Sequence, residues 1–551
     1  MKTTNYIIQF RLLILAVILI TSSCLKLEDQ SYEDQFIETF VPTEEDIQVI
    51  INSTYEDWRK ILLYWNGYWR VQEVGADEIV IPARPNGWVD AGEFRRMHEH
   101  TWVATDPNVI NTWSRTYEAI ENTNKVIGDL EAGVYGEGES LNLAVAELKV
   151  LRASYYYILC DLYGNVPIVE QSAFYLPAGY LPEQSTRKEV YDFIVEEISE
   201  NLPYLSRNRD VYTYAKFNYW AAVTLLAKMY LNAEVYSGTP EWEKCIEMCD
   251  IVINNDAGYA LESNQKNVFI TENENSVEIL FALFIESSLM NTAPGGADWN
   301  AFDHHMQTLQ PEQQSTYNIN YSPWGGMCAI PQFINTFDTL DSRLTENFLY
   351  GQQYSSTGDS LFVGMGSIIG DPLCYINEVP GVDYSEAIHG YRFVKYEIAV
   401  GTTNVLNNDY VLLRFADVLM MKAECLLRTG QTDEAAALVT QVRERAFTAD
   451  PGRAVVTGAQ LLEGSVYDYG LRNHNESTYE GGDDIEYGRF LDELGWEFNQ
   501  EGRRRQDMIR FGVYTTVSYL SHSPNGDYRI LYPIPSAELD KNPNLTQNPG
   551  Y

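Results

Sequence analysis

Apolar side chains recur every three or four positions in several windows of the 551-residue chain, which is the spacing of an amphipathic helix. Four such stripes lie in the first half, at residues 47–62, 109–127, 141–162 and 190–202. Gly164 and Pro167 follow the third stripe, and Pro203 follows the fourth, as expected at helix ends. The pattern therefore predicts four helices in this part of the chain.

Two later pairs of windows repeat one arrangement. Residues 217–236 and 242–253 form the first pair, and residues 410–428 and 435–446 form the second, each with a glycine-containing turn between its members. A long Ala-rich helix, a turn and a second helix with small residues at the crossing is the physical content of a tetratricopeptide unit, although the full signature is missing. We therefore predict a mostly α-helical fold, an array of about four tetratricopeptide-like helical hairpins.

The helical rhythm fails between residues 255 and 408. This segment holds glycine clusters, scattered aromatics and short β-rich runs such as residues 278–284. Because a structureless loop of this length is not expected in a compact protein, we predict an irregular, loop-rich subdomain docked on the helices. The chain then divides into an N-terminal helical region at 41–254, this subdomain at 255–408 and a C-terminal region at 409–551 with the last hairpin.

The first 23 residues have the features of a removable export signal. Lys2 and Arg11 precede a run of nine apolar residues, and small residues lead to Cys24. This ending resembles a bacterial lipobox, although Thr21 replaces the usual aliphatic residue. We therefore predict a lipoprotein signal peptide at 1–23, lipidation of Cys24 and a polar tether at 24–40. Acyl chains on Cys24 would anchor the protein stably.

Composition excludes some functions and leaves others open. The formal net charge is −40, so a nucleic acid would meet a repulsive field. The six cysteines after Cys24 are too few for a disulfide framework in a chain of this length. Four of them lie inside helical patterns, where we predict small buried apolar side chains: Cys160, Cys245, Cys249 and Cys425.

Several short motifs now form a series along the chain. In order they are Trp113, Tyr117, Ile120 and Asn124; Ala146, Glu147, Leu151, Arg152, Ala153, Tyr156 and Tyr157; Tyr163, Gly164, Asn165, Val166 and Pro167; Arg414, Asp417, Met421, Ala423 and Glu424; Val442, Arg443, Arg445 and Ala446; Glu497, Phe498, Glu501, Gly502, Arg503, Asp507 and Arg510; and Pro533, Ile534, Pro535, Asn544, Gln547, Asn548, Pro549, Gly550 and Tyr551. Together with the lipobox, this series resembles the SusD/RagB family of outer-membrane nutrient-uptake lipoproteins.

The resemblance implies a location, a partner and a role. It implies a lipid-anchored, cell-surface protein of the outer membrane whose helical face packs against a SusC-like TonB-dependent barrel. Members of the family capture glycan, or in some cases peptide, and close over the transporter as a lid. The family has no known chemistry, so the resemblance implies a binding protein rather than an enzyme.

The residues that carry the resemblance have a structural interpretation of their own. In the segment 497–510, opposite charges three or four residues apart favour a solvated or ion-paired helix surface. Arg503, Arg504 and Arg505 have the composition of a basic patch, but their acidic neighbours argue against a phosphate site. The closing Gln-Asn-Pro-Gly-Tyr sequence is typical of turns, and we expect it to fasten the C-terminus.

Two loops carry the candidate ligand-binding residues. Sugars are bound by flat aromatic faces together with planar polar groups, so tryptophans outside helices and beside polar residues are the candidates. The candidates are Arg84, Asn86, Trp88 and Asp90 in one loop and Trp299, Tyr321 and Trp324 in the irregular subdomain. The alternative for each tryptophan is a small satellite core beneath its own loop, and we assign Trp65 and Trp69 to the core.

Other signals are weaker. Asp483, Asp484 and Glu486 could hold a structural Ca²⁺, a cation that takes several oxygen ligands, whereas no other cofactor or metal is predicted. No GxSxG or HExxH motif suggests catalysis. Two alternatives to glycan capture stay open: capture of basic peptides, which an acidic surface would suit, and a secreted glycoside hydrolase with paired carboxylates.

Overall fold

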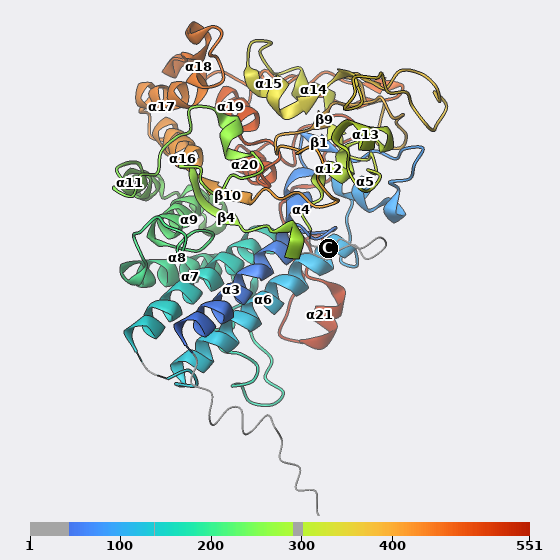
Figure 1. Cartoon of the computed structure of the whole chain (residues 1–551). Coiled ribbons are helices and arrows are strands. Elements are labelled where there is room, and N and C mark those ends of the chain that lie inside the picture. The colour runs from blue at the N-terminus through green and yellow to red at the C-terminus, as the bar shows by residue number, and fades with distance from the viewer. Residues whose placement is uncertain (1–42, 137, 290–300) are drawn as a thin grey trace, which may run out of the picture. The chain divides into compact units, whose positions relative to one another are not determined.

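The computed structural model describes residues 43–136, 138–289 and 301–551 (Figure 1). The residues from Val49 to Tyr551 form one compact unit, which contains the sites described below; the unit before it ends at Gln48. Its longer helices are α3 (Glu44–Leu62, which begins in the first unit), α6 (Pro107–Glu131), α7 (Glu139–Leu162), α8 (Arg187–Asn201), α9 (Tyr219–Leu231), α11 (Trp242–Ile253), α16 (Phe415–Arg428), α17 (Thr432–Glu444) and α19 (Gly488–Phe498).

The helices predicted from apolar periodicity are confirmed. Within the second unit, α6 packs against α7, α7 against α8, α9 against α11, α11 against α16, and α16 against α17. The first window of the 217–253 pair is interrupted, because α9 ends before Asn232 and the short α10 (Ala233–Ser237) follows. The four cysteines assigned to helix interiors are buried, as predicted, and none of them forms a disulfide. The fold is mostly helical, and neighbouring helices cover one another's apolar faces.

The segment 410–428 was predicted as one long helix, and that prediction is wrong in its first five residues. Tyr410–Arg414 forms strand β10, which pairs antiparallel with β4 (Ile279–Leu283), and α16 begins only at Phe415. Strand β4 lies in the β-rich run noted at 278–284. A short run of apolar residues fits a buried strand as well as a helix turn, so periodicity alone does not distinguish them.

The irregular region is built from short pieces, as predicted. In the described part of 255–408 the helices have at most six residues: α12 (His304–Thr308), α13 (Gln314–Tyr317), α14 (Pro331–Ile334) and α15 (Ser342–Asn347). Besides β4, its strands form two-residue ladders: β5 (Cys328–Ala329) with β1 (Ile79–Val80), β6 (Phe348–Leu349) with β9 (Arg392–Phe393), and β7 (Gly351–Gln352) with β8 (Cys374–Tyr375). The β1–β5 ladder ties this region to the segment that follows α4 (Tyr68–Glu73).

The remaining elements flank these regions. They are α5 (Glu93–His98), α18 (Gly458–Leu461), α20 (Arg504–Arg510), α21 (Ser536–Lys541), β2 (Val166–Pro167) with β3 (Gln184–Ser185), and β11 (Arg472–Asn473) with β12 (Glu476–Ser477).

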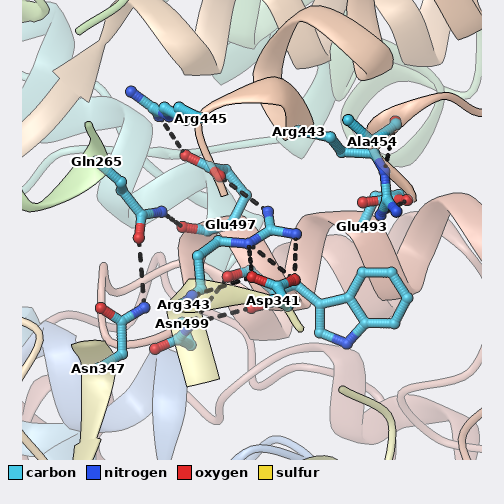
Figure 2. A network of polar contacts seen from close by, with 12 residues as sticks. Gln265, Asp341, Arg343, Asn347, Arg443, Arg445, Ala454, Glu493, Glu497 and Asn499 are labelled. Carbon is cyan, nitrogen blue, oxygen red and sulfur yellow. Dashed lines mark hydrogen bonds and ion pairs between the residues drawn. The ribbon is translucent and has the colours of Figure 1, made fainter. Parts of the chain in front are cut away.

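The charged segment 497–510 is buried, which corrects the prediction that it forms a helix surface. The Glu497 carboxylate accepts hydrogen bonds from Arg343 at 3.0 Å and Arg445 at 2.6 Å (Figure 2). It also accepts one from Arg414 at 2.8 Å. The side chains of Arg414 and Glu497 are 0 % and 1 % exposed, and Glu278 completes the group by accepting from Arg414 and Arg445. These groups are ion-paired, as the spacing suggested, but inside the protein and with distant partners.

The three consecutive arginines 503–505, which have the composition of a basic patch, form separate buried ion pairs instead. Arg504 bonds to Asp77 at 2.7 and 3.0 Å, and Arg505 bonds to Asp161 at 2.8 Å. Arg503 bonds to both Asp417 and Asp507, on α16 and α20. Each of the three consecutive arginines therefore fastens a different part of the fold.

The C-terminal residues are fastened as expected. The Asn548 amide donates to the carbonyl oxygens of Tyr163 at 2.8 Å and Tyr532 at 2.7 Å. The Tyr551 hydroxyl donates to the Leu531 carbonyl at 2.6 Å and accepts from the Trp102 indole at 2.7 Å. The tail thereby closes against α7 and the segment before α6.

Candidate functional site

The first candidate loop begins with a tight hairpin held from within. The main chains of Arg84 and Gly87 exchange two hydrogen bonds of 2.9 Å. The Arg84 guanidinium is buried and donates to the carbonyl oxygens of Gly326 at 2.8 Å, Glu386 at 2.6 Å and His389 at 3.1 Å. Burial lowers the pKa of Arg84 to about 9. Because the guanidinium is engaged by main-chain oxygens, the structure gives Arg84 the position of a support for the loop.

The next residues of this loop adopt a strained backbone. Trp88, Asp90 and Ala91 have φ values of 63°, 40° and 53°, and the glycines on either side, Gly87 and Gly92, are also at positive φ. Each non-glycine residue in this region costs on the order of 1–3 kcal/mol, so it persists only where the surroundings impose it. Strain of this kind clusters at ligand sites, which makes the loop a functional candidate.

The structure brings three tryptophans from distant segments together. The Trp65 and Trp88 rings are stacked with centroids 5.3 Å apart, and Trp324 meets Trp65 edge-on at 5.8 Å. Trp88 and Trp324 are 6.5 Å apart, and Phe94 of α5 packs against Trp65 at 5.8 Å. All three indoles are half-buried, so each keeps part of its surface in solvent. We call Trp65, Trp88 and Trp324 the aromatic cluster.

Hydrogen bonds join the two halves of the aromatic cluster. The Trp88 indole N–H donates to the Trp324 carbonyl oxygen at 2.8 Å, and the Asn86 amide donates to the same oxygen. A Cβ atom on Gly326 would lie 2.2 Å from the Trp88 ring, so only glycine leaves room for the indole there. The position of Trp88 is therefore set by Trp65, Trp324 and the main chain of Gly326.

A buried cation lies behind the cluster. The Arg70 guanidinium is 4.7 Å from the centroid of Trp65 and donates to the Gln307 side chain. Burial lowers the pKa of Arg70 to about 10, raises the pKa of Glu93 to about 7 and raises the pKa of Asp90 above its ordinary value. A cation behind an indole face stabilises the ring's position, and the carboxylates supply acceptors nearby.

The predicted site residues are placed as follows. Trp88, Asn86 and Trp324 come together, Asp90 is exposed on the strained loop, and Tyr321 is half-buried three residues before Trp324. Cys24 and Trp299 lie outside the described residues.

Sequence reasoning missed several members of the site. Trp65 was assigned to the core, yet it is half-buried and contacts Trp88, Phe94 and Trp324. Arg70 and Gly326 were not singled out. The only available signal for Trp65 was its place at the end of a helical stripe, where a side chain leaves the helix interface. Trp69 is buried, as expected.

The structure gives no support to a metal site in the part of the chain that it describes. No group of three or more His, Cys, Asp or Glu side chains there could hold a metal ion. The residues considered for Ca²⁺, Asp483, Asp484 and Glu486, are exposed. Among the described helices, none combines the length and apolar character needed to cross a membrane.

Comparisons with known proteins give one answer along nearly the whole chain. Residues 296–551 match the family model described as the SusD family, and residues 27–231 match the one described as starch-binding, associating with the outer membrane. The starch-binding protein SusD of Bacteroides thetaiotaomicron is 24 % identical over 74 % of this chain and 72 % of its own length. The SusD-like protein P25 of Formosa agariphila is 22 % identical over 98 % of this chain and 99 % of its own.

Solved structures show the same fold. A laminarin-binding SusD-like protein superposes with a TM-score of 0.70 at 19 % identity, covering 92 % of this chain and 100 % of that one. Surface glycan-binding protein A of Bacteroides thetaiotaomicron, in complex with laminarihexaose, superposes with a TM-score of 0.68 at 17 % identity, over 92 % and 100 % of the two chains.

Proposed function

The chain belongs to the SusD/RagB family, and from this premise we propose that it captures oligo- or polysaccharide at the cell surface. The observation that carries the proposal is the aromatic cluster. Trp88 of the strained loop meets Trp65 and Trp324, which come from two other segments of the chain, and all three indoles are partly exposed. Indole surfaces suit the apolar C–H faces of sugar rings, and a cluster of them offers contact at little conformational cost.

Each residue of the site has a proposed role. Trp324 and the exposed part of Trp88 contact the sugar, and Tyr321 extends the surface. Asp90 and Asn86 supply hydrogen bonds to hydroxyl groups. Arg84 supports the loop through its bonds to main-chain oxygens.

Localisation and delivery form the second part of the proposal. A lipid on Cys24 holds the protein at the outer membrane, and the protein passes its ligand to a SusC-like TonB-dependent barrel, over which it acts as a lid. The export signal and the outer-membrane description of the matching family model support this part. We further propose that the protein binds without cleaving, because its named relatives are binding proteins.

A glycan array followed by titration calorimetry tests the proposal. We expect Trp324→Ala to lower affinity for the best glycan by about two- to tenfold, because aromatic ring contacts contribute about 0.5–1.5 kcal/mol beyond their buried area. Thermal stability should change little, since Trp324 is half-buried. Tyr479→Ala, at a tyrosine 78 % exposed elsewhere, is the matched control. Unchanged glycan affinity in Trp324→Ala would remove the aromatic cluster from the binding site.

Two further readouts separate the alternatives. An array of basic peptides on the same protein tests peptide capture, which the net charge of −40 would favour. Incubation with the bound polysaccharide should release no reducing ends. Release of sugars would indicate a glycoside hydrolase with paired carboxylates instead.

A further inference from the structure

One exposed loop differs in composition from the rest of this acidic protein. Residues 171–182, with the sequence QSAFYLPAGYLP, contain no charged side chain, although 21 % of the whole chain is charged. Four large side chains of this loop face solvent: Phe174 at 73 %, Tyr180 at 48 %, Leu181 at 44 % and Tyr175 at 39 % exposure. We call residues 171–182 the uncharged loop. Clustered exposed apolar side chains of this kind mark an interaction surface.

The uncharged loop is held firmly in its exposed position. Ser172 donates from its hydroxyl to Glu121 at 2.6 Å, and the Ala173 main-chain N–H donates to the same carboxylate at 3.0 Å. The Tyr175 hydroxyl donates to Asp129 at 2.5 Å. The Tyr175 ring also lies against α6, since a Cβ on Gly128 would be 2.4 Å from it. The outward position of the neighbouring Phe174 is therefore built into the fold.

The surroundings of Phe174 combine an aromatic pair with a lysine. Phe174 and Tyr175 are edge-to-face with centroids 5.0 Å apart, and the Lys125 ammonium, which is ion-paired with Asp129, is 4.8 Å from the Phe174 centroid. Exposed Val134 lies just beyond the end of α6. Aromatic rings with a lysine beside them are typical of the interface between lipid headgroups and acyl chains, where the rings bury and the ammonium stays in the headgroup layer.

The uncharged loop lies at a particular end of the helical region. Asn122 on α6 bonds to Asp57 on α3 at 2.9 Å, and Arg115 on α6 lies 3.6 Å from the ring of Tyr64, which follows α3. The two helices are therefore antiparallel, as Figure 1 shows. The bond from Tyr175 to Asp129 places the uncharged loop near the C-terminal end of α6. Because the helices are antiparallel, this is also the end at which α3 enters the unit, at Val49.

From these observations we propose that the uncharged loop docks onto the lipid surface to which the protein is anchored. The inference rests on the lipidation of Cys24 in the proposed function, because that anchor precedes α3 in the chain and so favours this end of the helices facing the bilayer. The 19 residues from Leu25 to Thr43 allow a reach of up to about 65 Å, so the anchor favours this end without fixing the orientation of the body. Insertion of Phe174 and Tyr180 would fix its orientation.

Fluorescence on vesicles tests the docking. The lipidated full chain is placed on vesicles of phosphatidylethanolamine and phosphatidylcholine with brominated acyl chains, which quench indoles that enter the bilayer. We expect the emission added by Phe174→Trp to be blue-shifted and quenched. The control Tyr212→Trp, at a tyrosine 81 % exposed on a different loop, should add emission that bromine does not quench. Equal quenching in the two variants, or none in either, overturns the proposal.

A second measurement uses the unlipidated Cys24→Ser chain and sedimentation with plain vesicles of the same lipids. Phe174→Ser with Tyr180→Ser should lower the bound fraction by about threefold or more, because apolar contact area is lost. Val211→Ser with Tyr212→Ser, at two residues that are more exposed than Phe174 and Tyr180, should leave it unchanged. Glycan affinity should be unaffected in both, which separates this proposal from failure of the glycan site. Shielding of the loop by an added transporter barrel but not by lipid would assign the surface to a protein partner and overturn the proposal.

Discussion

The helices from α6 to α11 and the junction around α19 and α20 both bury side chains completely, but with opposite chemistry. In α7, Leu148, Leu151 and Ile158 are 0 % exposed, and most of the buried side chains of this helix are apolar. At the junction, Arg414 and Glu497 are equally buried, and their partners are charged. Burial of apolar area stabilises the first region directly. The second is stable only while every charge keeps its partner, since desolvation of each ion is costly.

This difference predicts how each region fails. Removing atoms from the helical region loses contacts in proportion to the cavity that is left. Removing one carboxylate from the junction takes one counter-charge from each of several buried arginines, even though little volume is lost. The four predictions below test the comparison from the largest expected effect to the smallest.

Glu497→Ala should have the largest effect. It leaves Arg343, Arg414 and Arg445 each without one carboxylate, and breaking a buried ion pair in this way costs about 3–5 kcal/mol. Urea denaturation monitored by circular dichroism gives the free energy of unfolding. Glu463→Ala, at an exposed glutamate, is the control. A loss below about 1 kcal/mol, the range of a surface pair, would show that the junction is hydrated rather than buried.

The matching change in the helical region is Leu151→Ala, which should cost about 2–5 kcal/mol through lost burial and a cavity. Leu151→Met conserves volume and should cost less than about 1.5 kcal/mol in the same denaturation experiment. The apolar region is thus expected to tolerate an isosteric replacement. If Leu151→Met were as damaging as Leu151→Ala, shape rather than apolar burial would dominate this interface.

Acid should distinguish the two regions by the slope of stability against pH. Burial raises the pKa of Glu497, but Arg445, Arg414 and Arg343 outweigh burial and hold the pKa well below its usual range. A carboxyl with a lowered folded-state pKa stabilises the protein above the unfolded value of about 4.3, and this stability is lost as pH falls below it. We expect the stability of Glu497→Gln to fall less steeply than that of the parent below about pH 4.3. Leu151→Ala should keep the parent's pH slope; equal slopes in all three proteins would contradict the assignment.

The same contrast explains how far the sequence led to the fold. Periodicity located α6, α7, α8 and α11 because their buried faces are apolar, which is what the pattern detects. It failed for the segment 497–510, where buried residues are charged and their partners lie far away in sequence, as with Arg504 and Asp77. Nothing local distinguishes such a segment from a solvated surface.

The candidate site shows a similar division. The loop of Trp88 could be selected because tryptophan beside Asn and Gly outside a helix is unusual, and Trp324 was selected for the same reason. The hydrogen bond from the Trp88 indole to the Trp324 carbonyl, and the edge-on contact of Trp65 with Trp324, join residues more than 200 positions apart in the sequence. Such convergence is a property of the tertiary structure, so the buried support of Arg84 could not be anticipated.

The smallest predicted effect concerns a helix end in the periodic region. The Thr186 hydroxyl accepts a hydrogen bond from the Glu189 main-chain N–H at the start of α8, and the Glu189 side chain accepts from the Thr186 main-chain N–H in return. Thr186→Ala removes half of this capping box and should cost about 1 kcal/mol, whereas Thr186→Ser should cost less because it keeps the acceptor. Urea denaturation measures both. A loss of several kcal/mol in Thr186→Ala would mean that α8 depends on its cap as strongly as the junction depends on Glu497, and the helical region would then not be held mainly by apolar burial.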